Sequence, residues 1–83
     1  GEEFVLLLPD TSFLEATGAL ERLRARLAHS PLLHEGRGIL VTFSAGVARW
    51  LPGESQDELL ARAARALCQA CHAGKNRVVA VER

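Results

Sequence analysis

Hydrophobic positions follow two different spacings in the first part of the chain. Phe4–Leu8 is a short apolar run that Pro9 stops, and such a run predicts a buried β-strand. Beyond it, apolar residues recur at helical spacing to about Ala28, opposite a charged face. Ser12 and Glu15 fit the S-x-x-E capping box, so we expect this helix to begin directly after Ser12.

The remainder of the chain repeats this alternation of strand and helix. His29–Gly38 contains one proline and two glycines and is predicted to be a loop. Ile39–Trp50 is rich in β-branched and small apolar residues, which favours strand. Ser55–Glu58 is a second capping box, and the helical pattern after it ends at Gly74, a typical C-cap residue. Val78–Val81 is the last predicted strand.

The predicted order is therefore β-α-β-α-β, within a single domain over residues 1–83. Strands that alternate with helices favour an α/β fold, an α+β sandwich in which helices pack on a sheet. A content of 48% hydrophobic and 24% charged residues is typical of a globular chain. Ten basic and ten acidic residues cancel, so the charge does not favour nucleic acid or an anionic membrane as a partner.

Three further features of the composition concern location and completeness. No apolar run approaches the ~20 residues that a membrane helix needs, and we expect no membrane contact from this segment. Two cysteines without a secretory signal predict a reducing, cytoplasmic setting. The sequence contains no methionine, so we expect it to be a piece of a longer chain.

Candidate chemistry lies at the mouth of the first predicted strand. Gly1 precedes two adjacent carboxylates, Glu2 and Glu3. Adjacent carboxylates repel each other, and a divalent metal with oxygen ligands is the simplest group to hold them. Taken alone, the same three residues equally fit a solvated hairpin tip.

Four segments, in order, resemble the GGDEF family of diguanylate cyclases. Gly1–Phe4 resembles the GG[DE]EF signature without its first glycine, and Leu20–Arg24 resembles the family's A-E-R-[IL]-R helix. Val41–Ala48 resembles its V-T-x-S-x-G-V-A strand, and Leu59–Val78 resembles its L-L-x-R-A-D-x-A-L-Y-x-A-K-x-x-G-[RK]-N-x-V ending. The resemblance covers essentially the whole chain and is to the C-terminal half of a GGDEF domain.

The resemblance implies a palm-like fold, similar to adenylate cyclases and polymerases, in which two GTP-loaded domains meet as a homodimer and form cyclic di-GMP. It also implies Mg²⁺ or Mn²⁺, which would activate a hydroxyl and neutralise phosphate charge. Glu2 matches the metal-binding catalytic acid, Glu3 the second acid of the turn, and Gly1 the residue that keeps the turn open to the nucleotide. Lys75 lies where a basic residue contacts the triphosphate. Arg22 matches an arginine of a product-inhibitory site, although it equally fits a solvated helix face.

Departures from the family pattern leave two functional interpretations. The family's other metal-binding and guanine-reading residues belong to an upstream half of the domain that this sequence lacks. Cys71 stands at the position of a phosphate-contacting lysine, Ala64 at that of an aspartate and Cys68 at that of a tyrosine. The chain thus belongs either to a cyclase or to a degenerate module used for nucleotide sensing or dimerisation.

The segment Cys68–His72 also spells C-x-x-C-H, the attachment motif of c-type haem. His29 or His34 could then serve as the second axial ligand. The competing interpretation places the motif inside the second helix, with Cys68 as a small packed hydrophobe on its inner stripe. Haem attachment needs an export signal that is not visible, so we expect the second. We expect Trp50 in the core or at its rim.

Overall fold

The computed structural model describes residues 5, 6, 8 and 10–81 of the 83-residue chain. The described part contains two helices and four short strands: α1 (Phe13–His29), β1 (Leu32–His34), β2 (Arg37–Ile39), β3 (Ala45–Ala48), α2 (Gln56–His72) and β4 (Val78–Val81). No helix in this part of the chain is long and apolar enough to cross a membrane.

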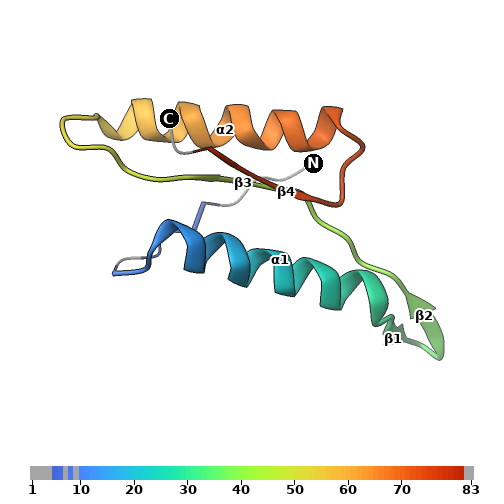
Figure 1. Ribbon diagram of the computed structural model, residues 1–83. Coiled ribbons are helices and arrows are strands. Elements are labelled where there is room, and N and C mark those ends of the chain that lie inside the picture. The colour runs from blue at the N-terminus through green and yellow to red at the C-terminus, as the bar shows by residue number, and fades with distance from the viewer. Residues whose placement is uncertain (1–4, 7, 9, 82–83) are drawn as a thin grey trace.

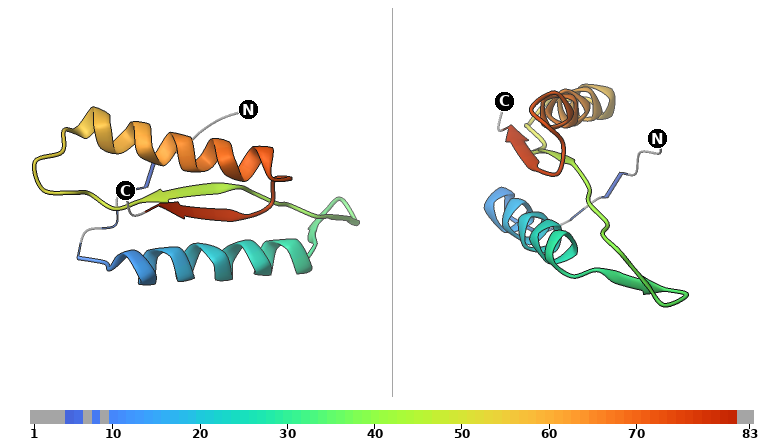
Figure 2. Two further views of the ribbon diagram at one scale, coloured as in Figure 1. Left: turned by 45° about the horizontal axis from the view of Figure 1, so that its top comes forward. Right: turned by 90° about the vertical axis from the view of Figure 1, so that its right-hand side faces the viewer.

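The strands β3 and β4 form a layer between the two helices (Figure 1 and Figure 2). They pair in parallel, from Ala45 opposite Val78 to Ala48 opposite Val81. Parallel neighbours need a long crossover connection, and α2 provides it. Both helices contact both strands, so the predicted sandwich of helices on a sheet is confirmed.

The core of the described residues consists of small side chains. Ala66 and Ala70 on α2 are fully buried, and Val47 on β3 and Ala16 on α1 are nearly so. Gly46 lets β3 approach α2 closely, because a Cβ added there would lie 2.3 Å from the backbone nitrogen of Leu67. The backbone of β3 therefore packs directly against the backbone of α2.

Both helices begin where the capping boxes predict. The Ser12 hydroxyl accepts a hydrogen bond from the Glu15 backbone nitrogen at 3.1 Å, and α1 starts at the next residue after Ser12. At α2 the box is complete, because Ser55 accepts from the Glu58 backbone nitrogen and Glu58 accepts from that of Ser55. These bonds satisfy amide groups that a helix start leaves without partners.

The predicted loop over residues 29–38 is wrong in part, because it contains most of an antiparallel hairpin of β1 and β2. Leu32 pairs with Ile39 and His34 with Arg37. Glu35 and Gly36 between them have φ values of 51° and 78°, and two-residue hairpin turns of this kind need two positive φ values. The hairpin projects beyond the end of α1 (Figure 1), and its strands are exposed.

Two predicted strand segments are also wrong where the structure describes them. Val5, Leu6 and Leu8 are not in a strand, and the rest of the run predicted at Phe4–Leu8 lies outside the described residues. Residues 40–44 separate β2 from β3 without strand structure. A strand requires a hydrogen-bonded neighbour, and β4 pairs only with residues 45–48.

Candidate functional site

The signature residues Gly1, Glu2 and Glu3 lie outside the described residues. Their roles as nucleotide-binding, metal-binding and catalytic residues therefore remain predictions. In the described part of the chain, no group of three or more His, Cys, Asp or Glu side chains could hold a metal ion. Of the residues predicted to bind the nucleotide, the structure describes only Lys75, which follows the end of α2.

Lys75 lies in a tight turn directly after α2. Gly74, Lys75 and Asn76 have φ values of 120°, 63° and 49°, so three consecutive residues are left-handed. The Lys75 backbone nitrogen donates to the Ala70 carbonyl at 2.9 Å, which ends the helix. Gly74 was expected to stop α2 and follows its C-cap residue Ala73. A left-handed conformation costs a residue such as lysine about 1–2 kcal/mol, so other contacts must hold the turn.

Those contacts come from α1 and from the chain just before β3. The Asn76 backbone nitrogen donates to the Ser44 hydroxyl at 2.9 Å. The Arg24 Nη1 donates to the Asn76 side-chain oxygen at 3.1 Å and to its carbonyl at 3.4 Å. The Arg24 Nε donates to both carboxylate oxygens of Glu21 at 3.0 Å. This hydrogen bonding lowers the pKa of Glu21 and raises that of Arg24.

Arg22 and Lys75 are not brought together by any hydrogen bond or ion pair among the described residues. Arg22 is exposed on α1, and Lys75 is exposed in the turn. The arginine that reaches the turn is Arg24, two residues further along the same helix. Arg24 matches the last arginine of the A-E-R-[IL]-R motif, but its contact was not predicted, because nothing in the local spacing links it to a residue 52 positions away.

Cys68, Cys71 and His72 are all exposed near the end of α2. The Cys68 sulfur lies 3.7 Å from the His72 Nδ1, and both cysteines are free thiols. The prediction that Cys68 packs on the inner stripe is wrong. The buried stripe passes through Ala66 and Ala70, and Cys68 is two residues from each, about 200° around the helix. Cys71, at the family's lysine position, is open to solvent.

A buried ion pair at the start of α2 was also not predicted. The Arg62 Nε donates to Glu54 Oε2 at 2.6 Å and its Nη2 to Glu54 Oε1 at 2.7 Å. The Arg62 Nη2 also donates to the carbonyl of Arg49. Hydrogen bonding to Arg62 holds the pKa of Glu54 below its ordinary value. The pair ties the loop between β3 and α2 to the helix; the match of Arg62 to the R-A-D motif was its only signal in the sequence.

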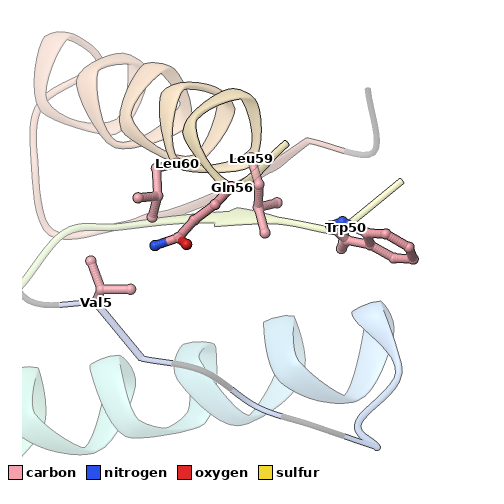
Figure 3. Close-up of a pocket in the computed structure, with 5 residues that line it drawn as sticks. All are labelled: Val5, Trp50, Gln56, Leu59 and Leu60. Carbon is pink, nitrogen blue, oxygen red and sulfur yellow. The ribbon is translucent and has the colours of Figure 1, made fainter. Parts of the chain in front are cut away.

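A cavity of about 490 Å³ opens beside this loop (Figure 3). Val5, Trp50, Leu59 and Leu60 contribute apolar walls, and Gln56 is its polar member. Trp50 is 56% exposed and donates from Nε1 to the Glu54 carbonyl at 3.2 Å, which places it at the rim of the fold as one of the two predicted positions. None of the described residues that line the cavity carries a charge that could bind a triphosphate.

Comparison with known proteins assigns the class of this domain. The sequence model described as "Diguanylate cyclase, GGDEF domain" matches residues 1–77, so the chain belongs to the GGDEF family. It is 41% identical over 78 residues to the diguanylate cyclase DgcP of Pseudomonas aeruginosa, covering 94% of this chain and 12% of that protein.

Two further relatives are similarly close. The chain is 40% identical over 82 residues to the response regulator PleD of Caulobacter vibrioides, covering 95% of this chain and 18% of that protein. It is 42% identical over 80 residues to the diguanylate cyclase DgcM of Escherichia coli, with coverages of 96% and 19%. The chain thus spans less than a fifth of the length of these three relatives.

Proposed function

We propose that the protein is a diguanylate cyclase, which joins two GTP molecules into cyclic di-GMP by metal-dependent nucleotidyl transfer. The match of the GGDEF family over residues 1–77 carries this proposal. Two of the similar proteins, DgcP and DgcM, are named diguanylate cyclases, and each aligns with at least 94% of this chain.

Lys75 is the described residue that would contact the triphosphate. Its ammonium group is a compact positive charge, and its side chain is exposed in the turn after α2. Its backbone is left-handed, with a φ of 63°. Arg22, exposed on α1, is free to contact product at a separate inhibitory site.

Glu2 is the residue of this chain that would hold Mg²⁺ or Mn²⁺, with Glu3 beside it and Gly1 leaving space for the nucleotide. When bound, the metal would activate the attacking 3′-hydroxyl and neutralise phosphate charge. The choice of a hard cation follows from the carboxylate oxygens, which are the ligands that Mg²⁺ prefers.

The reaction joins two nucleotides, each held by one domain, so we propose a homodimer as the working form. We also propose that it is cytoplasmic. We also propose that the family's upstream half packs against this chain. Val5 and Leu6 are 68% and 71% exposed, and Val5 lines the apolar cavity beside Trp50. Each strand of the two-stranded layer β3–β4 has one edge without a strand neighbour among the described residues, a template for such pairing.

A second candidate is a degenerate module that binds nucleotide, or dimerises, without catalysis. Cys71 favours it, because an exposed thiol stands where the family places a phosphate-contacting lysine. A thiol provides no fixed positive charge, so contact with the triphosphate is weaker.

Replacement of Glu2 in the full-length protein tests the proposal. Glu2→Gln should abolish cyclic di-GMP synthesis and weaken Mg²⁺-dependent GTP binding, because an amide is a poorer ligand for Mg²⁺. The melting temperature should change little, as for an ordinary surface position. Glu3→Gln should reduce activity less.

The control is Glu35→Gln, the same change in the exposed hairpin turn, which should leave synthesis intact. If the wild type is active and Glu2→Gln synthesises cyclic di-GMP equally well, the signature has no catalytic role. A wild type that binds GTP and forms no product would favour the degenerate module.

A further inference from the structure

The turn after α2 has an unfavourable backbone conformation and is held by hydrogen bonds from other parts of the fold. Gly74, Lys75 and Asn76 are consecutive left-handed residues, and only the first is glycine. Such conformations persist where neighbouring groups fix them, and they concentrate at functional sites. This backbone presents the side chain of Lys75, which is exposed and whose ammonium group makes no hydrogen bond or ion pair within the described residues.

The supporting bonds act on Asn76, the next residue, from two other parts of the fold. Arg24 on α1 donates to both oxygens of Asn76, and Ser44 accepts from its backbone nitrogen. Arg24 is itself oriented, because its Nε donates to both carboxylate oxygens of Glu21. Its side chain is only 19% exposed, so packing also restricts it.

We propose that Arg24 is a positioning residue for nucleotide binding, which holds Asn76 and thereby presents the Lys75 ammonium to the GTP triphosphate. This inference rests on the proposed function of Lys75. Arg24 does not contact the nucleotide; it acts through the turn. Glu21 completes the device, since its carboxylate fixes the guanidinium plane so that Nη1 faces Asn76.

The test is a double-mutant cycle on GTP affinity, measured by titration calorimetry with Mg²⁺ on the full-length protein. Lys75→Ala should weaken GTP binding about tenfold, the effect of one lost charge-assisted contact to phosphate. Arg24→Ala should weaken it by about fivefold, because the turn then samples conformations that withdraw Lys75. In the Lys75→Ala background, Arg24→Ala should cause no further loss, because its effect passes through Lys75.

Arg26→Ala is the matched control, since it removes the same charge from the same helix at an exposed position. It should leave GTP affinity unchanged, which excludes a general electrostatic effect of α1. Melting temperatures of all variants show whether they fold, and Arg24→Lys gives a milder replacement if Arg24→Ala does not. Lysine keeps the charge and cannot reproduce the bonds to both Glu21 and Asn76, so a loss of affinity is expected there too.

The outcomes separate the two proposals. If Lys75→Ala leaves GTP affinity unchanged, the phosphate role of Lys75 fails and the positioning role fails with it. If Lys75→Ala weakens binding while the folded Arg24 variants do not, the positioning role alone is wrong. If the losses from Lys75→Ala and Arg24→Ala simply multiply in the double variant, Arg24 acts independently of Lys75, which also overturns the inference.

Discussion

Arg62 is a charged side chain buried within the described part of the molecule, and its charge is balanced by the carboxylate of Glu54. The side chains of Arg62 and Glu54 are 9% and 8% exposed and share two hydrogen bonds. The Nη1 of Arg62 is buried and has no hydrogen-bond partner among the described residues. A buried charge without its counter-ion is strongly destabilising. Loss of the Glu54 carboxylate should therefore weaken the packing of α2.

This pair predicts an acid-sensitive fold. Hydrogen bonding to Arg62 lowers the pKa of Glu54 from 4.5. The stabilisation is therefore complete above pH 4.5 and is lost as the pH falls through the lower pKa of the folded state. We expect the free energy of unfolding, measured by urea titration of the full-length protein, to fall over this range. Glu54→Gln should be less stable at neutral pH and should lose less on acidification.

Glu35→Gln serves as the control, because it removes one carboxylate from the exposed hairpin turn, where no buried partner depends on it. Its pH dependence should follow the wild type. If Glu54→Gln and the wild type lose the same free energy below pH 4.5, the ion pair does not contribute to acid sensitivity.

Cys71 gives a second prediction at the scale of one residue. It is exposed in the last turn of α2, one helical turn before Lys75. Cys71→Lys places an ammonium at the family's phosphate-contacting position, and we expect GTP affinity to rise about tenfold, equivalent to 1.4 kcal/mol. Gln69→Lys adds the same charge about 160° away around the exposed helix and should have little effect. Equal affinities of Cys71→Lys and the wild type would mean that the triphosphate does not pass this position.

At the scale of elements, local signals predict helices better than strands. Ser12 and Ser55 mark the helix starts, because a cap depends on residues three positions apart. The strand predicted at Phe4–Leu8 is wrong over Val5, Leu6 and Leu8, because pairing depends on distant segments that an apolar run does not specify. The hairpin was missed because Gly36 indicated a loop and Glu35 is not a typical residue for a turn position with positive φ, although Gly36 suits the second position of a two-residue turn.

For the candidate site, too, the sequence predicted the local features and not the contacts between distant segments. Gly74 indicated the end of α2, and the family motif indicated Lys75. The left-handed Lys75 and the bond from Arg24 depend on how α1 packs near the turn between α2 and β4, which no local pattern contains. The roles of Glu2 and Glu3 rest on sequence resemblance alone.

Because β3 contacts α2 closely, Gly46 is the described glycine at which an added Cβ would meet the shortest contacts. A Cβ there would lie 2.3 Å from the Leu67 nitrogen, 2.4 Å from the Ala63 oxygen and 2.9 Å from the Ala66 carbonyl carbon, all backbone atoms. Gly46→Ala must push the strand and the helix apart, so we expect a loss of about 3 kcal/mol or more in the free energy of unfolding. Chemical denaturation of the full-length protein measures it.

Gly18→Ala is the matched control for this substitution. Its new Cβ would meet only the end of the flexible Arg22 side chain, at 3.3 Å, within α1. Alanine is the better helix former by about 1 kcal/mol, so this variant should gain stability. If Gly46→Ala is as stable as the wild type, β3 does not pack against α2 as closely as described.

At the scale of the whole molecule, the 83-residue chain exposes more surface than a compact monomer of its mass should. Its accessible surface is 6545 Å², whereas a folded monomer of 9.0 kDa is expected to expose about 4900 Å². Val5, Leu6, Leu40 and Trp50 are each more than half exposed. These exposed apolar side chains fit the proposal that further protein, which we take to be the family's upstream half, covers one side of this chain.

Trp50 can report on that cover, because it is the only tryptophan of the sequence and lines the apolar cavity. In the 83-residue chain it should emit at long wavelength and be quenched readily by iodide, since Trp50 is 56% exposed. In the full-length protein, with any other tryptophan replaced by phenylalanine, emission should shift to shorter wavelength and quenching should fall, because packing removes water from the indole. Leu59→Glu, which places a charge in the cavity wall, should restore both toward the values of the isolated chain, whereas Asp57→Glu on the same turn should not. If the isolated chain instead melts cooperatively as a monomer with Trp50 already protected from iodide, the cavity is closed within this chain and the proposed contact with an upstream half is wrong.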